Sequence, residues 1–132
     1  MPFVCLVCAA VSKHGVYATP VGSLTLDRPV IASLKSTKAF GEMSPSVDED
    51  EHSIEMQLPF LAHVMSQRKE PFTIVPILVG NLSGAKEQEF GKILAPYLQD
   101  NANFFVISSD FCQFSGQRAI ATSNSRTGSQ FR

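Results

Sequence analysis

The chain has few cysteines and almost no net charge, and each of these facts excludes some classes of protein. The 132 residues include three cysteines, an odd number with no second Cys-x-x-Cys pair. This count argues against a disulfide scaffold and fits a reducing cytosol. The formal net charge is −1, which provides no basic surface for nucleic acid and no polybasic patch for a membrane. We therefore expect proteins or small molecules as partners, and no nucleic acid.

A long apolar run is also missing. The N-terminal stretch MPFVCLVCAAV is apolar, but it is shorter than the roughly 18 residues of a membrane span. No Lys or Arg precedes it, as one would in a signal peptide. We expect no membrane span and a cytoplasmic protein, with the nucleus as a further location. The Cys5-x-x-Cys8 spacing invites a zinc or redox interpretation, but buried structural thiols suit this apolar stretch better.

The pattern of apolar residues predicts an α/β fold. Continuous apolar runs, rich in β-branched residues, predict buried strands at 3–11, 72–79 and 103–108. Helical spacing of apolar residues predicts helices at 28–40, 49–67 and 84–99, the second of them bent at Pro59. Strands that alternate with helices favour a largely parallel or mixed central sheet flanked by helices. Residues 12–26 contain Gly15, Pro20 and Gly22 and predict a loop followed by an extended segment. We interpret His14, in this loop, as a solvated histidine.

The most informative segment is DEDEHSIEMQLPF, residues 48–60. In a helix, one face would carry apolar residues for the core, namely Ile54, Leu58, Leu61 and Met65. The opposite face would carry His52, Glu55, Pro59 and His63. His52 and Glu55 are three residues apart, so they are neighbours that could share a metal, fix the tautomer of the imidazole, or form a structural hydrogen bond. The last interpretation is favoured, because the H-x-x-E-H motif would need a second histidine where Met56 stands.

A second polar cluster follows the last predicted strand. Asp110, Cys112 and Gln113 come just after FFVISS, and functional groups in open α/β sheets collect beyond the carboxyl ends of strands. Asp110 could hold a cation or orient a catalytic base, and Cys112 could be a soft ligand or a nucleophile. The alternative is ordinary turn chemistry, in which Ser and Asp side chains satisfy backbone amides.

Four segments in order, DEDEHSIEMQLPFL, FTIVPILVG, AKEQEFGKILAPYL and FFVISSDFC, closely resemble the Memo family, named for a mediator of receptor-tyrosine-kinase-driven cell motility. The resemblance is nearly continuous over residues 47–112 and weaker over 17–27. It implies a partial fold similar to that of class III extradiol dioxygenases, with a pocket of histidines, an aspartate and a cysteine. It also implies iron or copper in the full-length family, and signalling partners that include phosphotyrosine-containing receptor segments.

The chain also departs from the family pattern. The family's pocket aspartate and the cysteine near it correspond to Asp110 and Cys112, but Gln113 stands where the family has histidine, and glutamine cannot ionise. The family's upstream P-H-A-G-Y and G-P-S-H-H segments do not occur. The resemblance therefore predicts no metal site, no cofactor and no catalytic residue in this chain, with these three residues as a pocket remnant.

We accordingly predict a Memo-like chain truncated at both ends. Residues 1–114 would form an incomplete α/β domain, and residues 115–132 would form a divergent, disordered tail that arises from splicing or a shifted reading frame. The predicted role is that of a non-catalytic protein-interaction element in cytosolic signalling linked to cell motility and the cytoskeleton. The alternative is an iron- or copper-dependent redox or dioxygenase-like enzyme whose site needs segments missing here.

Overall fold

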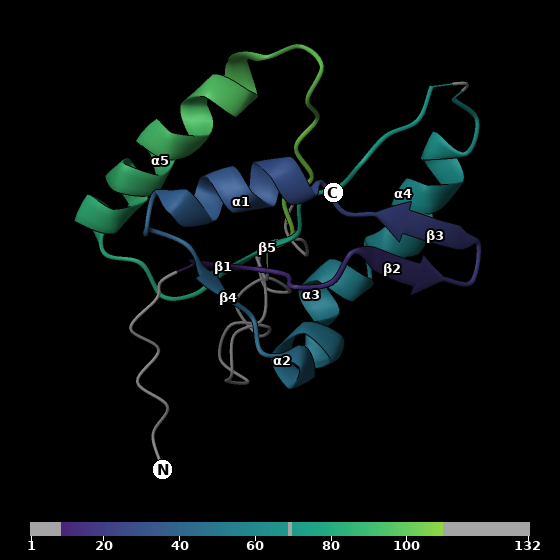
Figure 1. Cartoon of the computed structure of the whole chain (residues 1–132), viewed down its shortest axis with the longest axis horizontal. Helices are drawn as coiled ribbons and strands as arrows, with labels where there is room; N and C mark the ends of the chain where they lie inside the picture. The colour runs from purple at the N-terminus through teal and green to yellow at the C-terminus, as the bar shows by residue number, and fades with distance from the viewer. Residues whose placement is uncertain (1–8, 69, 110–132) are drawn as a thin grey trace, which may run out of the picture.

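The computed structural model describes residues 9–68 and 70–109 and shows a mixed α/β arrangement (Figure 1). Ten elements follow one another in this part of the chain. They are β1 (Ala9–Val11), β2 (Val16–Thr19), β3 (Gly22–Thr25), α1 (Arg28–Ser36), β4 (Gly41–Glu42), α2 (Pro45–Asp50), α3 (His52–Glu55), α4 (Leu58–Met65), β5 (Ile77–Val79) and α5 (Gly84–Gln99). None of the helices in these ranges is both long and apolar enough to cross a membrane.

The structure has the predicted mixed sheet, and β1 is the centre of its three strands. Strand β1 pairs in parallel with β4, with Ala10 opposite Gly41, and antiparallel with β5, with Ala10 opposite Leu78. Strands β2 and β3 form a separate hairpin, whose turn needs the positive φ of Gly22 (145°). Helix α4 packs against this hairpin. The sheet itself is therefore small, and packing between segments has to hold the fold together.

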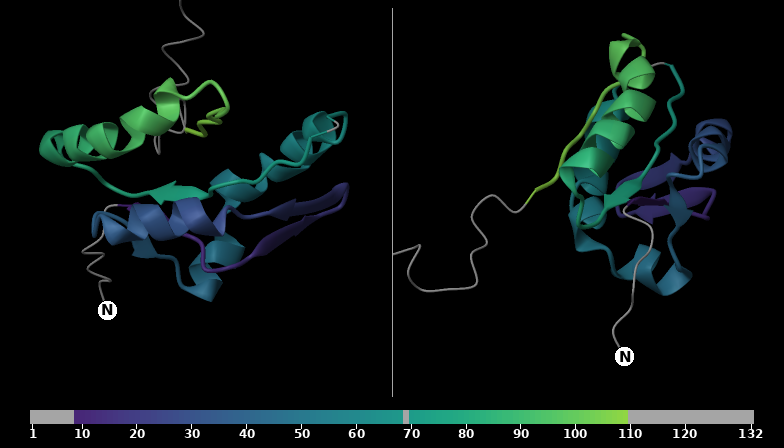
Figure 2. Two further views of the ribbon diagram at one scale, coloured as in Figure 1. Left: turned by 45° about the horizontal axis from the view of Figure 1, so that its top comes forward. Right: turned by 90° about the vertical axis from the view of Figure 1, so that its left-hand side faces the viewer.

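Helices α1 and α5 form the main core with the sheet. Asp27 caps α1, because its carboxylate accepts a hydrogen bond from the amide of Val30 at 3.0 Å. Helix α5 has the predicted bounds, and its Phe90 meets Phe40 edge to face with the ring centroids 5.0 Å apart. The buried core comprises Ala9, Val11, Leu26, Ile31, Leu34, Ala39, Phe40 and Phe90. Helices α2 and α3 lie on the other side of β1 from α5 (Figure 2).

The predicted bent helix over 49–67 is wrong in detail, because the structure has three short helices there. The first break is at Glu51, which is extended and whose carboxylate caps α3 by accepting a hydrogen bond from the amide of Ser53 at 2.9 Å. The second break precedes Pro59, which sits in the first turn of α4, where a missing amide donor costs nothing. The predicted apolar face is only half-buried, and Ala62 is the buried residue of α4.

The predicted strands are also shorter than expected. The strand predicted at 3–11 has described residues only from Ala9 on, and these form β1. The run at 72–79 is a strand only after Pro76, which confirms that this proline interrupts the ladder. The strand predicted at 103–108 is wrong: these residues are exposed and form no ladder in the described part of the chain. A β-rich composition does not produce a strand unless the segment pairs with a neighbouring strand.

Glu42 fastens β4 to its surroundings on the surface. Its carboxylate pairs with the ammonium groups of Lys35 on α1 and of Lys13, the latter at 3.2 Å. The hydrogen bond from Lys35, followed by that from Lys13, lowers the pKa of Glu42 below its usual range. These two ion pairs lie on the surface and connect the short strand β4 to α1 and to the loop after β1.

Removal of a core side chain tests this packing. We expect Leu34→Ala to lower the free energy of unfolding by about 2 to 4 kcal/mol, because a buried leucine loses its transfer energy and leaves a cavity. The matched control is Leu98→Ala, since Leu98 is 66% exposed whereas Leu34 is 2% exposed. Urea denaturation followed by circular dichroism gives both values. Equal losses for the two variants would contradict the assigned core.

Candidate functional site

The carboxylate of Asp48 is nearly buried and is surrounded by polar partners. Helix α2 holds it, and Ser44 caps this helix, because the Ser44 hydroxyl accepts a hydrogen bond from the amide of Val47. The Asp48 side chain is 2% exposed. The Ser12 hydroxyl donates to its Oδ2 atom at 2.5 Å, and the Tyr17 hydroxyl donates to its Oδ1 atom. We call Ser12, His14, Tyr17 and Asp48 the Asp48 network.

His14 completes this network. Its Nε2 atom lies 3.6 Å from the Oδ2 atom of Asp48, and its side chain is 40% exposed. The backbone of His14 is held as well, because its amide donates to the Ser12 hydroxyl at 3.0 Å and its carbonyl accepts from Arg28 at 3.2 Å. The predicted solvated histidine is therefore half-buried beside a carboxylate, and that interpretation needs correction.

The geometry of the network suits structure better than nucleophilic chemistry. In a hydrolytic triad the serine donates to the histidine, whereas Ser12 and His14 both approach the same oxygen of Asp48. Burial, reinforced by the hydrogen bond to Asp48, raises the pKa of Tyr17 above its usual range, so its proton is held firmly. The network thus joins the loop after β1 and strand β2 to helix α2.

The sequence pattern indicated His52 and Glu55 as a polar pair but gave no sign of Asp48 as a buried partner. Both lie exposed on α3, and no hydrogen bond or ion pair joins their side chains among the residues that the structure describes. His52 Nδ1 instead lies 2.5 Å from the backbone carbonyl of Asp50, to which it donates. Asp48 belonged to an acidic run that a helix start explains, and nothing local in the sequence pointed to partners more than 30 residues upstream.

The predicted pocket remnant, Asp110, Cys112 and Gln113, lies outside the described residues. Within 9–68 and 70–109, no three His, Cys, Asp or Glu side chains come together as a metal site would require. His14 and Asp48 bring together only two such side chains, and the Asp48 oxygens already accept hydrogen bonds from two hydroxyls. The described residues therefore do not fit iron or copper, and no chemical step is assigned to a metal.

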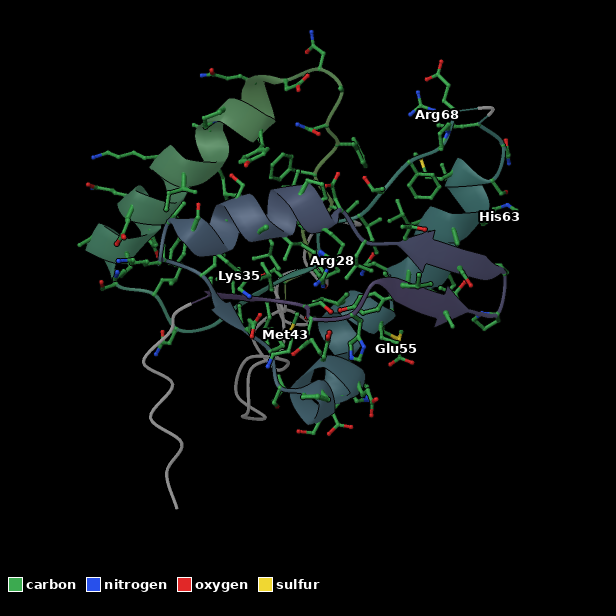
Figure 3. All side chains as sticks on the ribbon, viewed as in Figure 1. Arg28, Lys35, Met43, Glu55, His63 and Arg68 are labelled. Carbon is green, nitrogen blue, oxygen red and sulfur yellow. The ribbon has the colours of Figure 1, made fainter. Side chains whose placement is uncertain are left out.

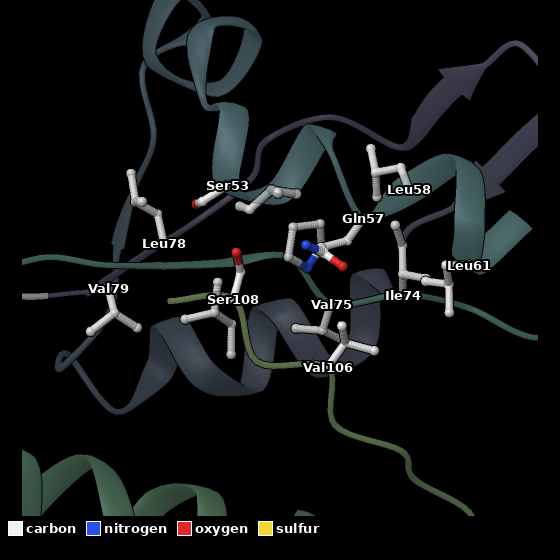
Figure 4. A pocket seen from close by; sticks show the side chains of 13 residues that line it. Ser53, Gln57, Leu58, Leu61, Ile74, Val75, Leu78, Val79, Val106 and Ser108 are labelled. Atoms are coloured by element: carbon white, nitrogen blue, oxygen red, sulfur yellow. The ribbon is translucent and has the colours of Figure 1, made fainter. Parts of the chain in front are cut away.

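An apolar groove runs beside β5 (Figure 4). We call it the β5 groove; its volume is about 210 Å³. It is lined by Ser53, Ile54, Gln57, Leu58, Leu61, Ile74, Val75, Pro76, Ile77, Leu78, Val79, Val106 and Ser108. None of these side chains carries a charge. The residues predicted to form the core face of the helix, Ile54, Leu58 and Leu61, are thus the wall of an open groove.

Removal of the Asp48 carboxylate tests its structural role. We expect Asp48→Ala to lower the free energy of unfolding by about 2 to 4 kcal/mol, because it leaves the hydroxyl groups of Ser12 and Tyr17 without their acceptor. Glu49→Ala is the control, since Glu49 is the exposed neighbour in the same helix and should change stability by less than about 0.5 kcal/mol. Urea denaturation measures both. Similar losses for the two variants would show that the network contributes nothing.

The raised pKa of Tyr17 predicts a loss of stability at high pH. In the unfolded chain a tyrosine ionises near pH 10, whereas the folded chain keeps the proton of Tyr17 to higher pH. The contribution of Tyr17 is therefore complete below about pH 10 and is lost as the pH rises further. Above that pH, the free energy of unfolding should fall more steeply for the wild type than for Tyr17→Phe. Parallel curves from denaturation at each pH would refute this.

The chain matches a known protein family along most of its sequence. The family model described as Memo-like protein matches residues 4–130. Protein MEMO1 of Danio rerio is 54% identical over 109 residues, which cover 83% of this chain and 36% of the relative. Protein MEMO1 of Homo sapiens is 51% identical with the same coverage.

A more distant relative agrees. Protein memo-1 homolog of Caenorhabditis elegans is 47% identical over 109 residues, which cover 83% of this chain and 30% of the relative. The chain thus spans about a third of the length of these curated relatives. With a family match over most of its length and a mixed α/β structure that fits part of the Memo fold, the chain belongs to the Memo-like protein family.

Proposed function

We propose that this chain is a non-catalytic protein-interaction element in cytosolic signalling linked to cell motility and the cytoskeleton. Membership of the Memo-like protein family supports the cellular context. The interaction role is supported by one structural observation, a stripe of exposed apolar side chains along α3 and α4. The non-catalytic role is supported by the Asp48 network, whose carboxylate oxygens are already satisfied by Ser12 and Tyr17.

The apolar stripe consists of Met56, Phe60 and Val64, which are 64%, 73% and 61% exposed. Residues four apart on a helix lie on the same side, and Met56 keeps helical dihedrals at the junction between α3 and α4. Together these residues form a continuous apolar surface about two helical turns long. Such a surface, rimmed by polar residues, marks a binding site for protein partners.

Polar and charged residues border the stripe. Glu55 lies at the α3 end, while His63 and Arg68 lie toward the far end of α4 (Figure 3). Arg68 is exposed, and a guanidinium group can bind a phosphate through two hydrogen bonds. We therefore propose that the partner is a peptide with apolar side chains for the stripe and a phosphotyrosine within reach of Arg68.

Fluorescence anisotropy with labelled receptor-tail peptides tests this function. Peptides with and without phosphate on tyrosine should be titrated with the 132-residue chain in the presence of a metal chelator. We expect Phe60→Ala to raise the Kd of both forms by about tenfold, because an apolar anchor is lost. Arg68→Gln should weaken only the phosphorylated form, since it removes only the phosphate contact.

Val64→Ser and Val21→Ser form a matched pair for this assay. Both valines are largely exposed, but Val21 lies in the turn of the hairpin and not on the stripe. Val64→Ser should weaken binding, and Val21→Ser should leave it unchanged. Failure of every peptide to bind would refute the interaction role as proposed. Binding that requires added iron or copper would favour the metal-dependent alternative instead.

A further inference from the structure

The charges along the stripe of Met56, Phe60 and Val64 are distributed unevenly. Residues 48–55 contain five carboxylates and no Lys or Arg, whereas residues 56–67 contain no Asp, Glu, Lys or Arg. The first basic residue after the stripe is Arg68. Glu55 and Arg68 lie toward opposite ends of the pair of helices (Figure 3). The apolar stripe therefore has an acidic end at α3 and a basic end just beyond α4.

Three of the five carboxylates at the acidic end face solvent. Asp48 is buried in its network, and Glu51 caps α3 by accepting a hydrogen bond from a backbone amide at 2.9 Å. Glu49, Asp50 and Glu55, in contrast, are exposed. Glu55 is the last residue of α3 and directly precedes the stripe. Its carboxylate is thus placed to meet a cationic side chain of a partner that lies along the stripe.

The length of the two helices sets the distance between the charged ends. Glu55 ends α3 and Met65 ends α4, so at a rise of about 1.5 Å per residue they lie roughly 15 Å apart. Arg68 follows closely, because its amide donates a hydrogen bond to the Met65 carbonyl at 3.0 Å. An extended peptide advances about 3.3 Å per residue. It would therefore need about five or six residues to reach from Glu55 to Arg68.

We propose that the stripe holds its partner peptide in one orientation, with a Lys or Arg of the peptide at Glu55 and the phosphotyrosine at Arg68. This inference rests on the proposed function and adds a second specificity contact to it. The fitting peptide carries its basic residue about five or six residues from the phosphotyrosine, with apolar side chains between them. Charges at the ends select the orientation of the peptide. The reversed peptide would bring its phosphate against the carboxylates and would be repelled.

Labelled peptides of one composition test this inference by fluorescence anisotropy with the 132-residue chain. Each contains one phosphotyrosine, an apolar segment and one lysine, and the lysine stands about two, six or ten residues from the phosphotyrosine, before or after it. We expect one peptide with the six-residue spacing to bind about two- to fivefold more tightly than the others, because an exposed ion pair contributes a modest free energy. This preference should shrink as the salt concentration rises.

Charge reversal assigns the contact to Glu55. Glu55→Lys should abolish the preference for the six-residue spacing, and replacement of the peptide lysine by glutamate should restore it for this variant. Glu87→Lys is the control, because it makes the same change at an exposed residue of α5 and should leave the preference as in the wild type. Circular dichroism checks that both variants fold.

The outcomes distinguish this inference from the proposed function. Peptides that bind equally well at every lysine position would overturn the orientation and leave the interaction role standing. Equal effects of Glu55→Lys and Glu87→Lys would also overturn it, because the preference would then come from a general attraction between the peptide and the chain. If no peptide binds, the interaction role fails and the orientation fails with it.

Discussion

The buried carboxylate of Asp48 is the interaction on which the arrangement of this chain depends. The sheet has three strands of two or three residues each, so its ladder hydrogen bonds alone cannot fix the surrounding segments. Asp48 ties the loop after β1 and strand β2 to helix α2, through Ser12, Tyr17 and His14. A buried charge is tolerated only while its partners stay in place, so these segments must keep one relative position. The hairpin in turn supports α4, and α4 forms one wall of the β5 groove.

The sequence predicted α5 over its whole length and α1 from its first residue, although α1 ends at Ser36 and not at residue 40. The determinants of both helices are local. Helix α1 begins at an Asp-Arg-Pro sequence in which Asp27 is the cap, and α5 follows from its spacing of apolar residues around Phe90. Both sets of determinants lie within the helix or beside it. The split of 49–67 into three helices depends on the extended backbone at Glu51. The composition of that region, with a strong apolar period, gave no sign of this break.

The features that the sequence could not predict depend on residues far apart in the chain. His14 and Asp48 are 34 residues apart, and each has a simple local explanation, as a loop histidine and as an acidic residue near a helix start. Residues 103–108 have the composition of a strand, but a strand forms only where an edge is available in the right register. The pocket remnant at Asp110, Cys112 and Gln113 lies outside the described residues, so its role stays a prediction.

Helices α3 and α4 present two apolar surfaces with different surroundings. One side, with Ile54, Leu58 and Leu61, lines the β5 groove, and the stripe that begins at Met56 remains outside it. The groove and the stripe therefore share no lining residue, although both are carried by the same pair of short helices. A molecule bound on the stripe would leave the groove accessible, because side chains on opposite sides of a helix do not meet.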